Sequence, residues 1–327
     1  MSVLALQRRR GGHQVGEPIE LRRIAVVRKA SAIDLLERRP DAKLQGALGG
    51  HDPLAERVLQ AHLENQASAD QVERELKQRS LDYRVVAALT PRLARWADLV
   101  VSVGGDGTFL RASHAVHAWG DGVGAPMLGV NSASSSAGFF CSATAQTFGA
   151  QLDRIAAGQL RSRPLWRMEI LVNGAVVGHQ ALNDVLYAHR VPAETSRYTL
   201  SLDGMSQEQK SSGIWVCTAA GSTGAMRSAG GSVQPMDSRE LQYLVREPMD
   251  WALKGEPLLK GCFSGELQAV SRMVSGALFI DGGNLRVPFG FGDRVMFRGS
   301  VLPLAWFAPP ELDQRRRALT QVLAPTT

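Results

Sequence analysis

The fold of this chain is decided by the stretch Leu99-Val100-Val101-Ser102-Val103-Gly104-Gly105-Asp106-Gly107-Thr108. Its first five residues form an apolar, mostly β-branched run of the kind that a parallel sheet buries on both faces. Apolar residues then recur at helical spacing from Phe109 onward, so the stretch predicts a strand, a glycine loop and a helix. Glycines let the loop backbone approach an anion, and the following helix offers its positive N-terminal end. The sequence therefore predicts a phosphate-binding loop.

Asp106 is the one carboxylate in this loop. An acidic residue in a loop that attracts phosphate suggests a chemical step or a metal. The alternative is that Asp106 only caps the helix or closes an Asx-turn, because Asp is favoured in both places. The loop is neither the G-x-G-x-x-G fingerprint nor a Walker A motif, since no G-K-[ST] follows its glycines. Spacing alone leaves both interpretations of Asp106 open.

Length and composition indicate a globular enzyme of two domains. The chain has 327 residues, 44% of them hydrophobic, which is ordinary for a protein with substantial cores. Its formal charge of +6 and pI of about 9.5 suit anionic substrates. Only 6% of the residues are aromatic and no stacking motif is present, so no nucleic-acid partner is expected.

Cysteine usage and hydropathy predict a cytoplasmic protein that does not cross a membrane. Cys141, Cys217 and Cys262 lack C-x-x-C spacing, so neither a zinc site nor a disulfide framework is indicated, and buried thiols are expected. No apolar stretch reaches the ~18 residues of a membrane helix, and the start lacks a signal peptide's apolar core. Residues 1–22, which include Arg8-Arg9-Arg10, are predicted to form a flexible, solvated arm.

Residues 23–152 are predicted to form a Rossmann-like, parallel α/β domain. Short apolar strands are expected at 23–28, 81–86 and 126–130, with helical segments between them. Ligands of such sheets bind beyond the carboxyl ends of the strands. Asn131 follows one of these strands, and it would lie beside the glycine loop if the two strands are neighbours.

Residues 153–300 are predicted to form an all-β, sandwich-like domain. The segment 168–177 is a hairpin with Asn173-Gly174 as its turn, and further short strands are separated by glycine turns. Residues 301–327 form a C-terminal segment, whose last part has the composition of a surface helix that returns to the first domain.

Two polar stretches of the second domain carry candidate binding groups. Asn183-Asp184 interrupts an apolar run, and such a pair must be hydrogen-bonded or face a cleft. It could hold a ribose diol, or it could cap an internal turn. The second stretch, Lys210-Ser211-Ser212-Gly213 followed by a strand and the loop Thr218–Gly231, offers hydroxyls and bare backbone to a polar ligand.

These motifs, in this order, resemble the NAD kinase family over residues 23–300. The first loop is also similar to that of diacylglycerol-type lipid kinases and, more distantly, phosphofructokinases. The NAD kinases share in addition the Asn-Asp pair, Gly221-Ser222-Thr223 and Ser228-Ala-Gly-Gly231. The branch that includes animal mitochondrial NAD kinases is the most similar, because it has the stretch found here at Gln209–Gly213.

The resemblance implies Mg²⁺-dependent transfer of a phosphoryl group from ATP, or from polyphosphate, to the adenosine-ribose 2′-hydroxyl of NAD, giving NADP. Asp106 would accept the proton of that hydroxyl. Gly104, Gly105, Gly107 and Thr108 would position the donor phosphates. The other implied nucleotide-binding residues are Arg111, Asn131, Asn183, Asp184, Arg197, Lys210, Gly221, Ser222, Thr223 and Ser228. The family likeness also implies a homo-oligomer, a dimer or tetramer, and no metal site built by the protein alone.

The sequence departs from the family pattern at three positions within these motifs. Ala225 stands where many NAD kinases have Tyr, while Lys210 and Ser212 replace an Arg and an Asp that commonly touch the dinucleotide. Two alternatives stay open: a lipid kinase, which shares the first loop, and a non-catalytic sensor, suggested by Ala225 and Ser212, that binds NAD or NADP without forming product. The replacements at Lys210 and Ser212 also leave open the choice between NAD and NADH.

Overall fold

A computed structural model of the chain describes residues 12–38, 41–50, 52–118, 122–133, 138–249, 257–283, 285–309 and 311–321. The chain forms two compact units. Unit 1 comprises residues 1–164 and 304–310, and unit 2 comprises residues 165–303 and 311–327. The division falls later than the boundary expected after residue 152, because helix α7 (Phe148–Ala156) and strand β6 (Arg163–Leu165) still belong to the first fold.

Unit 1 is built on a seven-stranded sheet. Its order is β2-β1-β3-β4-β19-β6, and β5 pairs with β4 outside this path. The pairs of β1 with β2 and β3, and of β4 with β3, β5 and β19, are parallel. Besides β6, the sheet consists of β1 (Arg23–Arg28), β2 (Asp82–Val86), β3 (Leu99–Gly104), β4 (Met127–Asn131), β5 (Cys141–Thr144) and β19 (Leu304–Trp306). The predicted parallel α/β class is confirmed.

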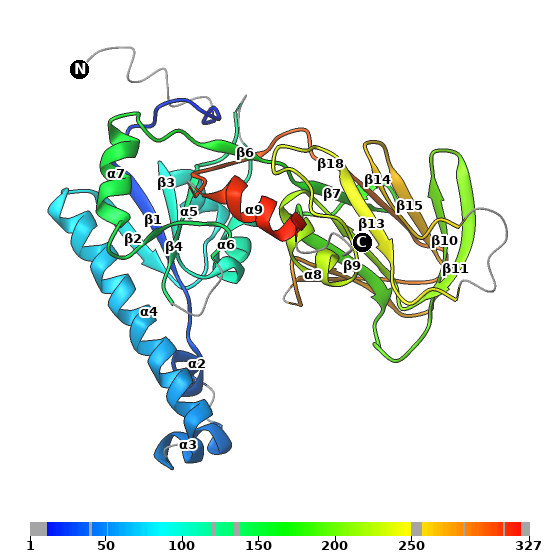
Figure 1. Cartoon of the computed structure of the whole chain (residues 1–327), viewed down its shortest axis with the longest axis horizontal. Coiled ribbons are helices and arrows are strands. Elements are labelled where there is room, and N and C mark those ends of the chain that lie inside the picture. Colours follow the sequence, from blue (N-terminus) through cyan, green and yellow to red (C-terminus); the bar gives the residue numbers. More distant parts are fainter. Residues whose placement is uncertain are drawn as a thin grey trace. The chain divides into compact units, whose positions relative to one another are not determined.

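Helices cover the sheet of unit 1 (Figure 1). On one side, α4 (Pro53–Gln78) and α7 pack against the alternate residues Leu99, Val101 and Val103 of β3. Helices α5 (Pro91–Trp96) and α6 (Asp106–Ser113) also contact the central strands. All six residues of β3 are buried, as expected of a strand covered on both faces.

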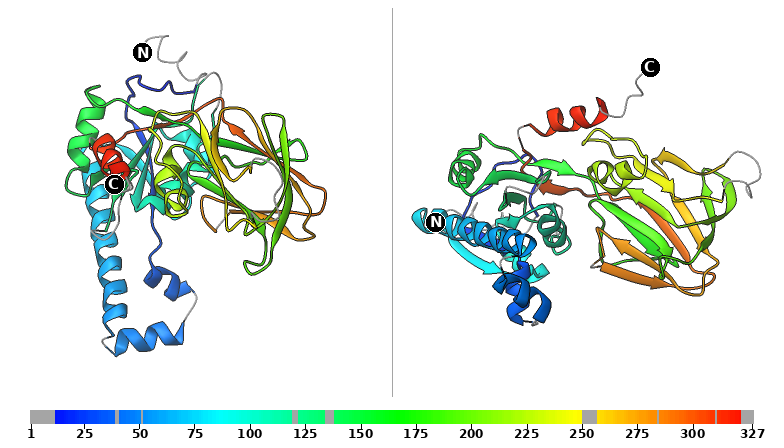
Figure 2. Two further views of the ribbon diagram at one scale, coloured as in Figure 1. Left: turned by 45° about the vertical axis from the view of Figure 1, so that its right-hand side comes forward. Right: turned by 60° about the horizontal axis from the view of Figure 1, so that its bottom comes forward.

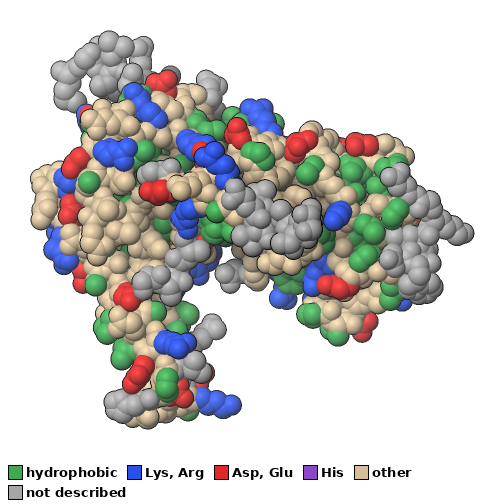
Figure 3. All heavy atoms as spheres, viewed as in Figure 1, with side chains coloured by type: hydrophobic (Ala, Val, Ile, Leu, Met, Phe, Trp, Pro, Cys, Tyr) green, Lys and Arg blue, Asp and Glu red, His purple; other side chains and the backbone are tan. Residues whose placement is uncertain are grey.

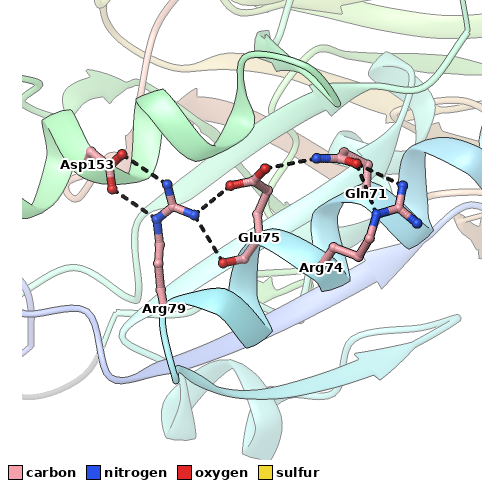
Figure 4. A network of polar contacts seen from close by, with 5 residues as sticks. All are labelled: Gln71, Arg74, Glu75, Arg79 and Asp153. Carbon is pink, nitrogen blue, oxygen red and sulfur yellow. Dashed lines mark hydrogen bonds and ion pairs between the residues drawn. The ribbon is translucent and has the colours of Figure 1, made fainter.

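Polar contacts tie α4 to α7 in unit 1 (Figure 4). The Arg79 guanidinium donates from Nε and Nη2 to the two oxygens of Asp153, each at 2.9 Å. It also donates from Nη1 to Glu75 on its own helix. A Cβ added at Gly149 of α7 would lie 2.2 Å from Glu75 Oε2, so the network needs a glycine there.

The helices α2 (Ala32–Arg38) and α3 (Ala42–Gly49) lie against α4, and Figure 2 shows α3 at the end of α4 that extends beyond the sheet. Part of the expected flexible arm is also held in unit 1. His13 and Val123 exchange backbone hydrogen bonds of 2.9 and 2.8 Å, and Gly16 N–H donates to Ser162 Oγ at 3.0 Å. The arm prediction is therefore wrong for these residues, while residues 1–11, with Arg8-Arg9-Arg10, lie outside the described residues.

Unit 2 contains two six-stranded antiparallel sheets, ordered β11-β10-β15-β18-β7-β8 and β14-β13-β12-β9-β16-β17. One core cluster joins them, with Ile170, Tyr198 and Leu200 from the first sheet and Tyr187 and Ile214 from the second. The first sheet consists of β7 (Met168–Val172), β8 (Ala175–Val176), β10 (Ser196–Leu202), β11 (Met205–Ser211), β15 (Leu267–Ser271) and β18 (Arg294–Gly299). The second consists of β9 (Asp184–His189), β12 (Ile214–Cys217), β13 (Leu241–Val245), β14 (Lys260–Phe263), β16 (Gly276–Ile280) and β17 (Leu285–Phe289). The sandwich-like all-β prediction is confirmed.

The C-terminal segment is divided between the units. Strand β19 enters the sheet of unit 1 beside β4, whereas helix α9 (Leu312–Gln321) belongs to unit 2. The expectation that this helix returns to the first domain is therefore wrong. Contacts with distant residues hold the helix in unit 2, because Leu312 is fully buried and the buried Arg316 is hydrogen-bonded to residues 219–234.

The surface agrees with the charge pattern of the sequence. On the face shown in Figure 3, Lys and Arg side chains are interspersed with Asp and Glu. Within the described ranges, no helix combines the length and the apolar character that crossing a membrane requires. The three cysteines are free. Cys141 and Cys217 are buried, but Cys262 is exposed, contrary to expectation, because its side chain alternates along β14 with that of the buried Phe263.

Candidate functional site

The predicted phosphate loop lies where β3 ends and α6 begins. Gly104 is the last residue of β3, and Gly105 is the cap residue before the helix. A Cβ added at Gly104 would lie 2.3 Å from Thr108 Oγ1, so no larger residue fits there. Thr108 is buried, whereas Gly107 is exposed. The loop therefore presents backbone to solvent at the carboxyl edge of a parallel sheet.

Asp106 is the first residue of α6 and is half-buried. Phe140 N–H donates to its Oδ1 at 2.8 Å. Gly105 occupies the cap position, and no side chain caps this helix end. In the described part of the chain Asp106 Oδ2 has no partner, so one carboxylate oxygen is held and the other is available. The interpretation of Asp106 as a helix cap is not supported.

Asn131 lies beside the glycine loop, because the parallel register of β3 and β4 pairs it with Gly104. Ser132 N–H donates to Gly104 O at 3.2 Å. On the other side of β3, Lys29 N–H donates to Val103 O at 2.9 Å. Arg111 is exposed in the last turn of α6, one turn beyond Gly107. The register therefore brings Asn131 and the glycine loop together at one edge of the sheet of unit 1, whereas Arg111 lies further along α6.

In unit 2, the Asn183-Asp184 pair is held by a residue that the motifs did not identify. Asp281 accepts hydrogen bonds from the N–H groups of Leu182, Asn183 and Asp184 at 2.8, 2.7 and 3.0 Å. Asp281 itself has φ of +47° in the turn after β16. The signal available in the sequence was Asp281-Gly282-Gly283, which is typical of any strand turn.

Asp184 is 7% exposed and lies near this second carboxylate. Burial, followed by the negative charge of Asp281, raises the pKa of Asp184 to about 7. Near neutral pH the Asp184 carboxyl can therefore accept a hydrogen bond as a carboxylate or donate one as an acid.

The second glycine loop packs directly on this pair. It comprises the 3₁₀ turn Ala220–Thr223 and the short helix α8 (Ala225–Ser228). A Cβ added at Gly221 would lie 2.0 Å from Asn183 O. One added at Gly224 would lie 3.5 Å from Asn183 Nδ2 and 3.7 Å from Asp184 Oδ2, so both side chains face Gly224. The structure thus brings together two stretches that are separate in the sequence.

Ser222 lies inside the loop, and its side chain is fully buried. Its hydroxyl donates to Ala219 O at 2.7 Å and accepts from Gln234 N–H at 2.9 Å. Arg316 Nη2 also donates to Ser222 Oγ at 2.9 Å, and to Ala219 O and Gln234 O at 2.6 and 2.5 Å. The Ser222 hydroxyl therefore stabilises the loop from within, contrary to its expected orientation toward a ligand.

Thr223 and Ser228 lie on the outer side of the same loop. Thr223 is half-buried and its hydroxyl donates to Ala220 O at 3.4 Å, while Ser228 is exposed and donates to Gly224 O at 3.5 Å. Both side chains lie near the surface around Gly224.

Arg197 and Lys210 lie elsewhere in unit 2. They are directly opposite each other on β10 and β11, and both are exposed. Their neighbours Tyr198 and Ser211 point into the core and share a hydrogen bond of 2.8 Å. Strand alternation therefore places Arg197 and Lys210 on the outer face of the other sheet, so the structure does not bring them to Asn183.

Comparisons with known proteins identify relatives of this chain. The family model of the ATP-NAD kinase N-terminal domain matches residues 47–160. A probable NADH kinase of Oryza sativa subsp. japonica is 38% identical over 239 residues, covering 66% of this chain and 72% of that protein. An NADH kinase of Arabidopsis thaliana is 37% identical over 247 residues, covering 68% and 76%.

Solved structures extend the likeness to the fold. The NAD kinase of Archaeoglobus fulgidus, determined in complex with ATP, superposes with a TM-score of 0.66 at 19% identity, covering 92% of this chain and all of that one. Yeast NADH kinase complexed with NADH gives a TM-score of 0.65 at 14% identity, covering 97% and 94%. These structures show the shared fold, and the plant relatives define the class as a kinase. The chain belongs to the NAD kinase family. The closer likeness to the branch of the animal mitochondrial enzymes stays a prediction.

Proposed function

We propose that this protein transfers the terminal phosphoryl group of ATP to the adenosine-ribose 2′-hydroxyl of NAD or NADH, giving NADP or NADPH. Asp106 carries the proposal: it opens α6 at the glycine loop, with one carboxylate oxygen held by Phe140 N–H. The ATP in the Archaeoglobus structure supports the donor, and the names of the plant relatives support NADH as an acceptor. Polyphosphate is the alternative donor.

Positioning and charge stabilisation are the main tasks in phosphoryl transfer. Gly104, Gly105, Gly107 and Thr108 would position the donor phosphates through backbone N–H groups and the N-terminal end of α6. Asp106 Oδ2 would accept the proton of the attacking ribose hydroxyl. Asn131 lies at the same edge of the sheet and would contact the phosphates or ribose. Arg111, one turn along α6 from Gly107, would approach the phosphates.

The residues of unit 1 fit a magnesium ion that arrives with the nucleotide. Mg²⁺ takes oxygen ligands and is often bound through one or two carboxylates together with substrate phosphates. Asp106 and Asn131 offer such oxygens at the loop. Among the described residues no group of three or more His, Cys, Asp or Glu could hold a metal by itself. When bound, the ion would neutralise charge on the phosphates.

Asn183 and Asp184 would hold a ribose of the dinucleotide, because amide and carboxyl groups can receive and donate the hydrogen bonds of a diol. Gly221, Thr223 and Ser228 would line the same ligand, and Ser222 would shape their loop. Arg197 and Lys210, which lie on the outer face of the other sheet, have no role in this proposal. We also propose a homo-oligomer, a dimer or tetramer, and a cytoplasmic location.

The substrates are tested by incubating the protein with Mg²⁺ and NAD or NADH, each with ATP or polyphosphate, and by detecting NADP or NADPH. Diacylglycerol is included as a competing acceptor. Phosphorylation of diacylglycerol alone would favour a lipid kinase. Binding of NAD or NADP without any product would favour a sensor.

The role of Asp106 is tested with Asp106→Asn. We expect turnover to fall by about 10²-fold or more, since a general base contributes that much, while NAD affinity is retained. Asp70→Asn, at an exposed position of α4, is the control and should leave turnover unchanged. Normal turnover of Asp106→Asn would exclude Asp106 as the base, and loss of NAD binding would indicate a structural role.

A further inference from the structure

Among the described residues, the carboxylate of Asp106 is oriented by one backbone group, the N–H of Phe140, which donates to Oδ1 at 2.8 Å. Asp106 begins a helix, whereas Phe140 lies in the turn before β5, so the two belong to different elements of unit 1. Whatever fixes Phe140 therefore also fixes the direction in which the free oxygen Oδ2 points.

Phe140 is fixed by two aromatic side chains. Its ring stacks on that of Phe109, with centroids 5.0 Å apart and planes 4° from parallel. Its ring also meets the ring of Trp306 edge to face, at 6.0 Å and 68°. Phe109 and Trp306 contact each other at 6.4 Å and 70°, so the three rings form one closed cluster.

Trp306 adds a polar contact to this packing. Its indole Nε1–H donates to Phe140 O at 3.0 Å, across 166 residues of sequence. Phe140 is therefore hydrogen-bonded at both ends of its backbone: its carbonyl is held by Trp306, and its N–H holds Asp106. Trp306 is fully buried on β19, which pairs with β4 at the centre of the unit 1 sheet.

We propose that Trp306 is a positioning residue for the phosphoryl transfer, and that it orients Asp106 through the backbone of Phe140. The inference rests on the proposed function, because it assumes that Asp106 is the base. The ordinary alternative is that Trp306 only fills the core and satisfies its own N–H. The two differ in one respect: a positioning residue matters for turnover only while the carboxylate of Asp106 is present.

The experiment is a double-mutant cycle of Trp306→Phe and Asp106→Asn. Phe keeps a ring in the core but removes the N–H donor. We expect Trp306→Phe alone to lower kcat roughly 10-fold, since small misplacements of catalytic groups are costly, and to change the KM for NAD less than twofold. In the Asp106→Asn background the same substitution should have no further effect on kcat, because coupled residues are not additive.

The control is Trp96→Phe, which makes the same substitution in α5, just before β3, where Trp96 packs against Arg84. It should leave kcat unchanged. If Trp306→Phe does not fold, Phe109→Leu takes its place in the cycle, because it removes the ring stacked on Phe140.

The outcomes separate the inference from the function on which it rests. An equal loss of kcat in both backgrounds, or no loss in either, would overturn the role of Trp306 while the kinase assignment stands. If the native protein forms no NADP or NADPH, the proposed function itself fails. If Asp106→Asn alone is fully active, Asp106 is not the base, and the role of Trp306 is overturned while the kinase assignment stands.

Discussion

The chemistry of Asp184 is set by where its side chain lies. An exposed Asp ionises near pH 4, but burial and the neighbouring Asp281 charge raise the pKa of Asp184 to about 7. A carboxyl whose pKa is higher in the folded than in the unfolded state stabilises the folded state at pH values below its pKa in the unfolded chain. This contribution to the free energy of unfolding is lost as the pH rises from about 4 through about 7. The Asp184 carboxyl therefore lowers the free energy of unfolding at physiological pH.

Asp184→Asn should stabilise the protein, and the gain should grow with pH. A pKa raised from about 4 to about 7 corresponds to about 4 kcal/mol in the free energy of unfolding at pH 8, and to about 1–2 kcal/mol at pH 5. Urea unfolding at the two pH values measures the difference. Asp70→Asn on the surface of α4 is the matched control and should show neither gain. A gain that is the same at both pH values would contradict the raised pKa.

Among elements, the contact between the second glycine loop and the start of β9 depends on the absence of a side chain. The Gly221 backbone lies so close to Asn183 O that an added Cβ would overlap it, at 2.0 Å. The turn at Ala220–Thr223 and the Asn183-Asp184 pair can therefore share one surface only while residue 221 is glycine.

Gly221→Ala should push these two elements apart. We expect a loss of stability of about 1–3 kcal/mol, as for other overpacked sites, and at least a 10-fold loss of NAD affinity. Isothermal titration with NAD and urea unfolding measure the two effects. Gly178→Ala is the control, because nothing lies within 4 Å of its added Cβ and its φ is ordinary. Unchanged NAD affinity in Gly221→Ala would separate this loop from the dinucleotide site.

At the scale of the whole molecule, helix α9 is hydrogen-bonded to the second glycine loop, which lies much earlier in the sequence. Arg316 Nη2 donates hydrogen bonds to Ser222 Oγ, 94 residues earlier in the sequence, and to Ala219 O and Gln234 O. Burial lowers the pKa of Arg316. One buried side chain of the last helix thus organises the second glycine loop.

Arg316→Met should weaken that loop while keeping most of the apolar stem of the side chain. Leaving buried carbonyls without a donor costs about 1–3 kcal/mol each, so we expect a loss of about 2–4 kcal/mol in the free energy of unfolding. Arg317→Met, at the exposed neighbouring position, should stay within about 0.5 kcal/mol of the native protein. Equal effects of the two substitutions would show that α9 acts only by covering the surface.

Most of the fold could be predicted from local patterns. The buried run at 99–103 and the hairpin turn Asn173-Gly174 each carry their own signal, and both residues of that turn have the positive φ that it needs. The candidate site was predicted only in part. Asp106 stands out because it is acidic in a loop that attracts anions. The Asn183-Asp184 pair stands out because it is polar within an apolar run.

By itself the sequence determined the parallel sheet, the β-sandwich and the two polar motifs, since burial on one or both faces imposes a periodicity within a few residues. Only the tertiary structure decided that Phe140 holds Asp106, that Asp281 holds Asn183, and that α9 joins the second unit. These contacts join residues 34 to 98 positions apart. No local period encodes them, because a single hydrogen bond between distant segments leaves no repeating pattern in either one.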